Sequence, residues 1–539
     1  MRLRAGATSA VGALLVAAMA MIATVSSPSA ATVANDERAI VHVLNRIGFG
    51  PRPGDVERIQ GIGLQQYIDQ QLHPERVPDP GMAARLAGLQ TIGLSSRDIA
   101  EDYERPMLEA RRARKQQQRN AADEPEMIRR PQDTLPGQQR ANIVVVELAE
   151  QKLQRAIYSE HQLEEVLADF WFNHFNVDAR KGRVRFLLTE YEREAIRPHV
   201  LGNFRDLLEA TAKSPAMLFY LDNWMSADPN GPHLDAPMRR EAFGAGARRR
   251  PRRGSALPTA QQRAAPQPNR APRGLNENYA RELMELHTLG VDGGYTQKDV
   301  TEVARAFTGW TIEHRRGGGG FRFEPRLHDD GAKMVLGHSL KAGGGIRDGE
   351  QVLDLLARHS STARVISTKL VRRFVSDVPP AGLVDRLAAR FTDTHGDLRA
   401  VMTLLLASPE FLAPASYRAK VKTPFEFVVS AVRATGAQFA DTRMLIKAVQ
   451  DLGMPLYQCQ PPTGYKDTAD AWTNTGALVN RMNFALAISG APQVEGALAR
   501  FEELLAHDLS DTTRATIAKA TAPAQALALG LGSPEFQYR

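Results

Sequence analysis

Residues 276–290 read Asn-Glu-Asn-Tyr-Ala-Arg-Glu-Leu-Met-Glu-Leu-His-Thr-Leu-Gly, and this stretch decides the fold class. Asn276 is a typical helix N-cap and Gly290 a typical residue at a helix end, so the run predicts one helix. Residues three and four apart share a face of a helix. Two stripes follow: one of Asn278, Glu282, Glu285 and Leu289, and a neighbouring apolar one of Tyr279, Leu283 and Leu286. The stretch therefore predicts an amphipathic helix packed on a core.

The same spacing recurs along most of the chain. Apolar residues stand at helical intervals at Ile40, Val43, Leu44 and Ile47, at Leu163, Val166, Leu167 and Phe170, and at Ala363, Ile366, Leu370 and Phe374. Thr296 and Asp299 have the spacing of a capping box and predict a helix that runs to Trp310. Asp348 with Gln351 predicts the start of another helix. We therefore expect a mainly α, multi-helix globular protein with long loops.

Residues 321–336 are the exception to this pattern. Phe-Arg-Phe-Glu at 321–324 alternates in polarity, which is typical of a strand. His-Asp-Asp-Gly at 328–331 is turn chemistry, and Met-Val-Leu at 334–336 can return as a second strand. A small β-hairpin is predicted there.

The first thirty-one residues have the layout of a secretory signal peptide. Arg2 and Arg4 give a basic start, an apolar run extends from Ala10 to Val25, and small residues lead to Ala31. The run is shorter than the roughly 18–20 apolar residues that cross a bilayer. We therefore expect cleavage near Ala31, no membrane span after cleavage, and a soluble protein that is periplasmic or secreted.

Composition divides the rest of the chain into helical segments and insertions. The expected order is a helical segment at 32–100, a charged insertion at 101–140, a helical body at 141–224, a disordered Arg/Pro-rich linker at 225–273, the body continued at 274–490 and a helical tail at 491–539. Between Arg239 and Arg273 there are ten arginines and one glutamate, whereas the whole chain has a net charge of +7. The linker could bind an anionic polymer, although a solvated spacer is the simpler explanation. Phe243 is its one aromatic residue, so the arginines are not interleaved with aromatic residues that stack on bases, which argues against specific nucleic acid.

Three groups of residues are candidates for chemistry. His174 follows Phe170 by one helical turn, so it is either a hydrogen-bonded core histidine or a general base or ligand in an apolar cleft. Glu282 and Glu285 lie one turn apart and can share a proton or a cation, but Arg281 with Glu285 can equally form a surface pair.

The third group is His328 and Asp329 with nearby Lys333, although a hairpin turn explains these residues without function. The sequence has no His-Glu-x-x-His, P-loop or Gly-x-Ser-x-Gly motif, so spacing assigns no metal and no cofactor. Cys459 is the only cysteine, which excludes an intramolecular disulfide. A buried bystander is a simpler interpretation of this thiol than a reactive group.

Several runs together resemble a known family. They are Leu-Asn-Arg-Ile-Gly-Phe-Gly-Pro at 44–51, Phe-Trp-Phe-Asn-His-Phe at 170–175, Tyr-Leu-Asp-Asn at 220–223, the whole of 276–290, Phe-Thr-Gly-Trp at 307–310, His-Asp at 328–329 and Lys-Thr-Pro-Phe-Glu-Phe at 422–427. Over roughly residues 40–490 the chain resembles the bacterial exported family catalogued as domain of unknown function 1800. The resemblance implies export and a neighbouring exported sulfatase-like protein as a partner, but no activity. The Arg/Pro-rich insertion before Gly274 and the run from Cys459 to Tyr465 depart from the family pattern.

Two functions agree with these features. The first is a hydrolase-like acid–base enzyme that acts on envelope or environmental polymers. In it His174 is the base, Glu282 the acid or a cation ligand and Asn278 an orienting donor, while His328 and Asp329 complete the cleft. The second is a non-catalytic scaffold or binding partner of the neighbouring exported protein. The first function requires all five side chains to converge.

Overall fold

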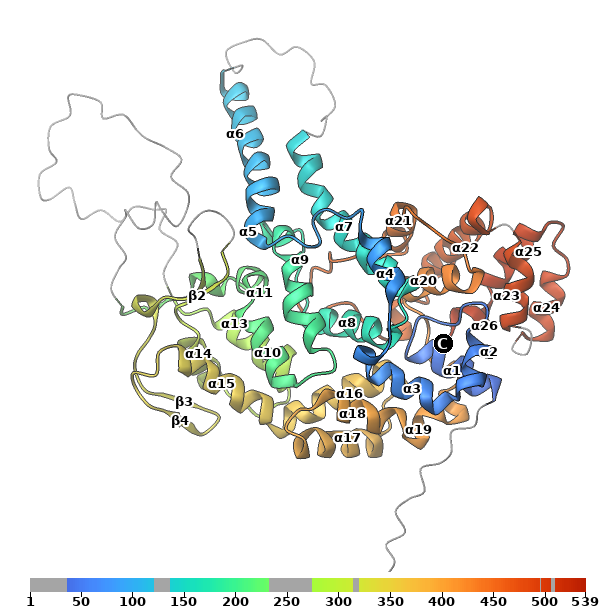
Figure 1. Ribbon diagram of the computed structural model, residues 1–539. Helices are drawn as coiled ribbons and strands as arrows, with labels where there is room; N and C mark the ends of the chain where they lie inside the picture. Colours follow the sequence, from blue (N-terminus) through green and yellow to red (C-terminus); the bar gives the residue numbers. More distant parts are fainter. Residues whose placement is uncertain (1–35, 121–135, 232–273, 314–318, 495, 506–508) are drawn as a thin grey trace, which may run out of the picture.

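The computed structural model describes residues 36–120, 136–231, 274–313, 319–494, 496–505 and 509–539 (Figure 1). The predicted signal peptide and residues 232–273 of the predicted linker lie outside the described residues. Within the described part the protein is mainly α-helical, which confirms the predicted fold class. Among the helices of that part, none is long and apolar enough to cross a membrane.

One helix, α20 (Pro424–Thr435), runs through the core, and all of its residues are buried. Its sequence is largely apolar on every side, the pattern of a helix enclosed by others. A capping box of Thr423 and Glu426 starts it. The helices α7 (Pro136–Tyr158), α21 (Arg443–Asp451) and α23 (Ala497–Leu505) pack against it. One apolar cluster extends from Ile40 to Phe536, so segments from both ends of the chain share a core.

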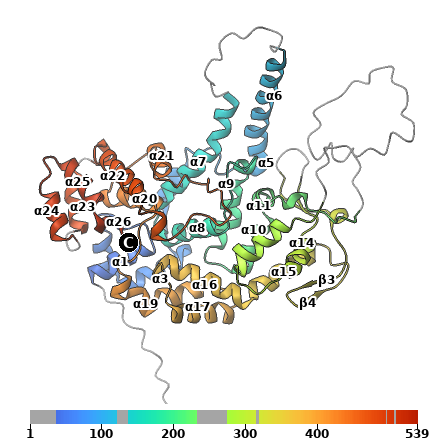
Figure 2. The same ribbon diagram turned by 180° about the vertical axis from the view of Figure 1, so that it is seen from behind.

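The N-terminal part forms short helices and a two-helix arm. The short elements are α1 (Glu37–Arg46), α2 (Asp55–Ile62), α3 (Leu64–Leu72), η1 (Pro74–Arg76), α4 (Pro80–Leu86), α5 (Ser96–Ile99) and the π-helix η2 (Ala100–Glu104). Helix α6 (Arg105–Asn120) and the start of α7 stand out from the body (Figures 1 and 2). A small cluster with Tyr103, Met107 and Phe186 packs at their base. Both described ends of the predicted charged insertion are therefore helical.

The middle and the C-terminal parts are chains of helices around the core. The middle contains α8 (Gln162–His174), η4 (Val184–Phe186), α9 (Leu188–Glu190), the π-helix η5 (Tyr191–Ile196), η6 (Arg197–His199), α10 (Phe204–Lys213), α11 (Pro215–Tyr220), η7 (Asn223–Met225), α15 (Ile346–Arg358), α16 (Ser360–Phe374), α17 (Ala381–Asp393), α18 (Leu398–Leu406), α19 (Pro409–Leu412) and η11 (Pro414–Ser416). The C-terminal part adds η12 (Ala469–Ala471), α22 (Thr475–Ser489), η13 (Pro492–Val494), α24 (Asp511–Ile517), α25 (Pro523–Leu531) and α26 (Pro534–Gln537). Residues 225–231, assigned to the linker from sequence, are packed in part: Ser226 and Ala227 are buried and Asp228 N donates to Leu327 O at 2.9 Å, whereas Met225, Pro229 and Asn230 are exposed.

Two small antiparallel sheets lie where one hairpin was predicted. β1 (Trp310–Ile312) pairs with β2 (Phe321–Phe323), and β3 (Lys333–Val335) pairs with β4 (His338–Leu340). The short helix η10 (Pro325–Leu327) lies between the two sheets along the chain. The strands exist where the sequence predicted them, but their predicted pairing with each other is wrong. Leu336 and Gly337 both have positive φ, which closes a tight two-residue hairpin after β3.

Apart from the cap at Asn276, helix starts were predicted from sequence at Thr296 and Asp348, and the first of these is confirmed. Thr296 and Asp299 form a capping box on α14 (Gln297–Ala306), which ends before Trp310 because Trp310 starts β1. The cap predicted at Asp348 is wrong, since α15 already begins at Ile346. The Asp348 carboxylate instead accepts a hydrogen bond from Lys333 at 2.6 Å.

The helix predicted over 276–290 changes its hydrogen bonding midway. Asn276 caps α13 (Glu277–Glu282), as predicted, by accepting from Tyr279 N. The chain then continues as the π-helix η9 (Leu283–Thr288). A π turn contains more residues than an α turn, so residues that would share one face of a continuous α-helix come to lie on different faces. Asn278 is exposed whereas Leu289 is buried, although the predicted stripe joined them.

Candidate functional site

A pocket of about 310 Å³ lies between α8, α16 and the segment 454–468. We call it the α16 pocket. It is lined by Asp169, Phe170, Asn173, His174, Lys369, Arg372, Arg373, Thr423, Met454, Thr463, Tyr465, Lys466, Asp467 and Thr468. Three cationic side chains, Lys369, Arg372 and Arg373, reach it from one face of α16 because they are spaced at i, i+3 and i+4. Its size is at the lower end for small-molecule sites.

The end of η9 fixes two side chains at this pocket. Carbonyls in the last turn of a helix have no partner within the helix. His287 O pairs with Nε2 of His174 at 3.1 Å, and Leu286 O accepts a hydrogen bond from Nζ of Lys369 at 3.3 Å. The π-helix thereby ties α8 to α16.

His174 is a buried and neutral imidazole. Its Nε2 faces the carbonyl oxygen of His287, so Nε2 carries the proton and Nδ1 accepts from Nζ of Lys369 at 2.9 Å. Burial, and next the charge of Lys369, lower the pKa of His174 well below its ordinary value. His174 therefore has features of both predicted alternatives. It is hydrogen-bonded like a core histidine, and it also lies on a pocket wall.

Lys369 is a half-buried lysine that forms no ion pair with a carboxylate of the described residues. Burial, and next the charge of Arg372, lower the pKa of Lys369 to about 8. The neighbouring His287 adds no charge, since burial lowers its pKa to about 3. A sizeable fraction of Lys369 is therefore the neutral amine at pH 7 to 8.

Arg373 connects the pocket to a buried ionic network. Its Nη1 lies 2.5 Å from Oε1 of Glu426 on α20, and Nε of Arg539 lies 3.0 Å from the same oxygen. Burial alone would raise the pKa of Glu426, but Arg373 and Arg539 hold it at about 2. Within the described part of the chain, Nε and Nη2 of Arg373 and Nε of Arg372 are buried without a hydrogen-bond partner. These three nitrogens are closed off from solvent, so the guanidinium groups meet the pocket through their other atoms.

The opposite wall is held in place by an asparagine of α8. Nδ2 of Asn173 donates to Tyr465 O at 2.8 Å, and its Oδ1 accepts from Tyr465 N at 2.7 Å. Gly464 has φ +74°, and a Cβ there would lie 2.3 Å from Asn173 O. Only glycine allows this close approach. The segment that carries Tyr465 is therefore positioned by backbone contact with α8.

The other predicted site residues lie elsewhere. Asn278 is exposed and Glu282 is half-buried, and neither lines the α16 pocket. Burial, and next the neighbouring charge of Glu285, raise the pKa of Glu282. Of the five predicted residues, His174 alone lines this pocket. The roles assigned to Asn278 and Glu282 from sequence stay predictions.

His328 and Asp329 belong to a second buried cluster. Nε2 of His328 lies 3.2 Å from Oδ2 of Asp348, and Nζ of Lys333 lies 2.6 Å from the same oxygen. These three side chains are almost completely buried. Asp329 receives two hydrogen bonds from Arg305, at 2.7 and 3.0 Å. The cluster ties α14 and the β3–β4 sheet to α15.

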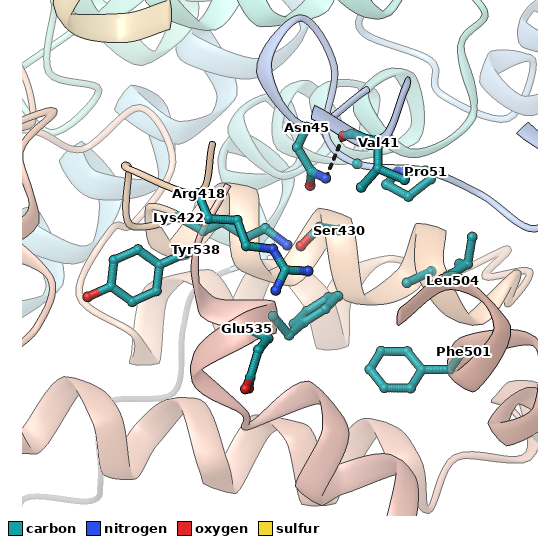
Figure 3. A pocket seen from close by; sticks show the side chains of 13 residues that line it. Val41, Asn45, Pro51, Arg418, Lys422, Ser430, Phe501, Leu504, Glu535 and Tyr538 are labelled. Carbon is teal, nitrogen blue, oxygen red and sulfur yellow. Dashed lines mark hydrogen bonds between the residues drawn. The ribbon is translucent and has the colours of Figure 1, made fainter. Parts of the chain in front are cut away.

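A second cavity, shown in Figure 3, lies beside α1, α20 and α26 and is too small for a substrate. Arg418 and Lys422 point into it near Glu535, and Asn45 donates to Val41 O at 2.8 Å. Its volume of about 20 Å³ has room for about one water molecule. The α16 pocket is therefore the better candidate site.

Neither the cysteine nor a metal cluster adds to the site. Cys459 is buried, and burial raises its pKa to about 11, so the thiol stays protonated. In the segments that the structure describes, no group of three or more His, Cys, Asp or Glu side chains is arranged to hold a metal ion.

Sequence reasoning missed Lys369 and Arg372. The signal was the i, i+3, i+4 spacing of Lys369, Arg372 and Arg373, but basic residues are common in the last turn of a helix. Their partners on η9 and their position at a pocket depend on segments far away in sequence.

One comparison with known proteins is informative. The family model described as "Protein of unknown function (DUF1800)" matches residues 42–538. No curated protein and no solved structure matches the chain.

Proposed function

Since the chain belongs to the DUF1800 family of proteins of unknown function, we propose from its own geometry that it is a hydrolase-like acid–base enzyme with Lys369 as the general base. The observation that carries this proposal is a lysine with a lowered pKa, held by His174 and Leu286 O on the wall of a pocket. General bases work best when their pKa lies near the working pH.

The hydrogen bonds of Lys369 leave its lone pair free for the substrate. A neutral amine has two N–H donors and one lone pair. His174 Nδ1 and Leu286 O take the two donors. The lone pair can then accept a proton from a water molecule in the pocket while that water attacks the substrate. The ammonium group afterwards returns the proton to the leaving group, which completes a hydrolysis.

The titration of Lys369 tests this proposal without a known substrate. Competitive acetylation followed by mass spectrometry measures the reactivity of each lysine against pH. We expect a midpoint near pH 8 for Lys369, well below the value of about 10.4 that is ordinary for a lysine side chain. A midpoint near 10.4 for Lys369 would overturn the proposal.

A panel of ester, phosphate and sulfate substrates then tests for turnover. Loss of a general base typically costs about 10² to 10⁴ in rate. We expect that loss for Lys369→Met and unchanged rates for Lys447→Met, since Lys447 is exposed on α21. Equal turnover in the two variants would remove Lys369 from the mechanism.

The compartment and the substrate source form the second part of the proposal. We infer export through the signal peptide at residues 1–31, with envelope or environmental polymers as substrates. The leader-like composition of these residues supports export. N-terminal sequencing of the protein from its host is expected to show cleavage near Ala31, and an intact N-terminus in the cytosol would contradict export.

The arm supports a second function, which is binding of a partner such as the neighbouring exported sulfatase-like protein. Residues 111–116 of α6 are exposed and include Arg111, Arg112, Arg114 and Lys115. An isolated basic helix of this kind suits an acidic protein surface. Co-purification that is lost on reversal of these four charges and kept in Lys369→Met would favour binding over catalysis.

A further inference from the structure

We propose that the α16 pocket binds an oxyanion, meaning a carboxylate, sulfate or phosphate group carried on a ring-shaped body, and that Arg372 is its main anchor. This inference rests on the proposed function, because it names the substrate class of the same site. Charge and wall composition support it separately.

The carboxylates of the pocket are already neutralised by other cations. Asp169 lies 2.7 Å from Nζ of Lys152. Asp467 lies 3.6 Å from Arg373 and 3.6 Å from Lys420. Arg372, in contrast, has no ion pair with any carboxylate in the part of the chain that the structure describes. The pocket wall on α16 therefore carries uncompensated positive charge.

Some N–H groups of the guanidinium side chains on this wall also lack hydrogen-bond acceptors. A guanidinium has five N–H donors, and a buried donor without a partner costs free energy. Nε of Arg372 and Nε and Nη2 of Arg373 are in this state, and only 4% of the Arg373 side chain is exposed. Oxyanions are the natural acceptors for a guanidinium, because they offer charged oxygens at matching spacing. The three named nitrogens are closed off from the pocket, so a bound oxyanion would balance the charge of Arg372, whose half-buried side chain lines the pocket, rather than fill these donors.

The remaining wall indicates what carries the anion. Phe170 and Tyr465 are half-buried aromatic residues, and Met454 adds an apolar side chain. Rings pack on ring-shaped groups through their faces. A volume of about 310 Å³ holds one such unit rather than a long segment. The site therefore fits a single charged ring unit, either free or at the end of a chain.

Binding of the anion also changes the base. Arg372 is the charged neighbour that lowers the pKa of Lys369. The other titratable groups beside Lys369 are His174 of α8 and His287 of η9, and both are neutral. An anion beside Arg372 screens its charge and supplies an opposite charge of its own. Lys369 should therefore become harder to deprotonate when the site is filled.

The test measures the titration midpoint of Lys369 in the full chain with inorganic phosphate, sulfate or acetate against chloride at equal ionic strength. We expect a bound oxyanion to raise the midpoint by about one pH unit. Arg372→Gln should raise the midpoint in chloride and should weaken anion binding about 10- to 100-fold, measured by calorimetry. Arg364→Gln is the matched control, because Arg364 lies on the exposed side of the same helix and pairs with Asp385.

The outcomes separate this inference from the proposed function. A midpoint near pH 8 that none of the three anions moves would overturn the inference and leave the base intact. Anion binding that depends on Arg372 while Lys369 titrates near 10.4 would support the inference and overturn the base. Equal anion effects in Arg372→Gln and Arg364→Gln would mean that binding occurs elsewhere, which overturns the inference. The anion with the strongest effect identifies the oxyanion.

Discussion

Among the described residues, the histidine–lysine pairs His328–Lys333 and His174–Lys369 differ in one carboxylate. His328 and Lys333 share Asp348, which lies 3.2 and 2.6 Å away, and all three side chains are closed off from solvent. Nδ1 of His174 and Nζ of Lys369 are 2.9 Å apart at a pocket wall, and each side chain pairs with a separate carbonyl oxygen, of His287 and Leu286, instead of a shared carboxylate. The same residue types therefore build a structural tie in one place and a titratable amine in the other. The counter-charge and the access to a pocket distinguish them. We call His328 with Lys333 the closed pair and His174 with Lys369 the open pair.

The largest expected effect comes from removing the counter-charge of the closed pair. Asp348→Asn leaves the Lys333 ammonium buried without its partner, and breaking a buried ion pair typically costs about 3–5 kcal/mol. Urea unfolding of this variant should show a loss of that size. Asp385→Asn breaks an exposed pair with Arg364 and should cost less than about 1 kcal/mol. A similar small loss for Asp348→Asn would mean that the two pairs are not different in kind.

A substitution at Gly464 should damage the open pair by moving the pocket wall. An alanine Cβ would lie 2.3 Å from Asn173 O at a φ of +74°, so clash and strain add. We expect a loss of about 2–3 kcal/mol on thermal unfolding and weaker anion binding in the α16 pocket. Gly453→Ala is the matched control, since its φ is +93° but no atom lies within 4 Å of the added Cβ. Its loss should be about 1 kcal/mol, from strain alone.

The open pair should make stability depend on pH. Folding lowers the pKa of Lys369 from its ordinary 10.5 to about 8. Between these values the unfolded chain binds more protons than the folded one, so Lys369 makes stability rise with pH from about 8 to 10.5. Below pH 8 its destabilising contribution is complete and constant. Relative to wild type, Lys369→Met should lose stability by on the order of 1 kcal/mol across this window, measured by urea unfolding. A flat difference from pH 7 to 11 would contradict the lowered pKa.

The smallest expected effect is at Asn278. Its side chain is exposed and lies outside the α16 pocket. Asn278→Ala should change unfolding free energy by no more than about 0.5 kcal/mol and leave the Lys369 midpoint unmoved. A shift of that midpoint would restore Asn278 to the site predicted from sequence.

The helices were predictable because their signals are local. Spacing and caps located α1, α14 and the start of α13, since an N-cap such as Asn276 needs only the next few residues. The strand pairing was not predictable, because three-residue strands carry little register information and the Leu336-Gly337 turn decided it. The helix predicted from Thr296 to Trp310 ends earlier than expected, because Trp310 belongs to the strand β1, whose pairing was not predictable either.

The site was less predictable than the fold. His174 was singled out because its helix has a clear apolar stripe. Lys369 was not, since its lowered pKa depends on burial and next on the charge of Arg372, and its burial and its hydrogen bond to η9 arise only in the folded chain. The prediction that Asn278 and Leu289 share one helix face was wrong, because it assumed α-helical spacing through residues that form a π-helix. Sequence therefore located one side chain of the pair but not its partner.

The π-helix at 283–288 also limits how this region can change in length. Its Leu286 and His287 carbonyls point at Lys369 and His174 only because the wider turn sets their direction. Deleting one residue from this stretch would let it relax to α spacing and rotate both carbonyls away, whatever side chains remain. Variants that shorten η9 by one residue should therefore lose the hydrogen bonds that hold His174 and Lys369, even where most single substitutions in η9 are tolerated. The number of residues in this turn matters more than which residues they are.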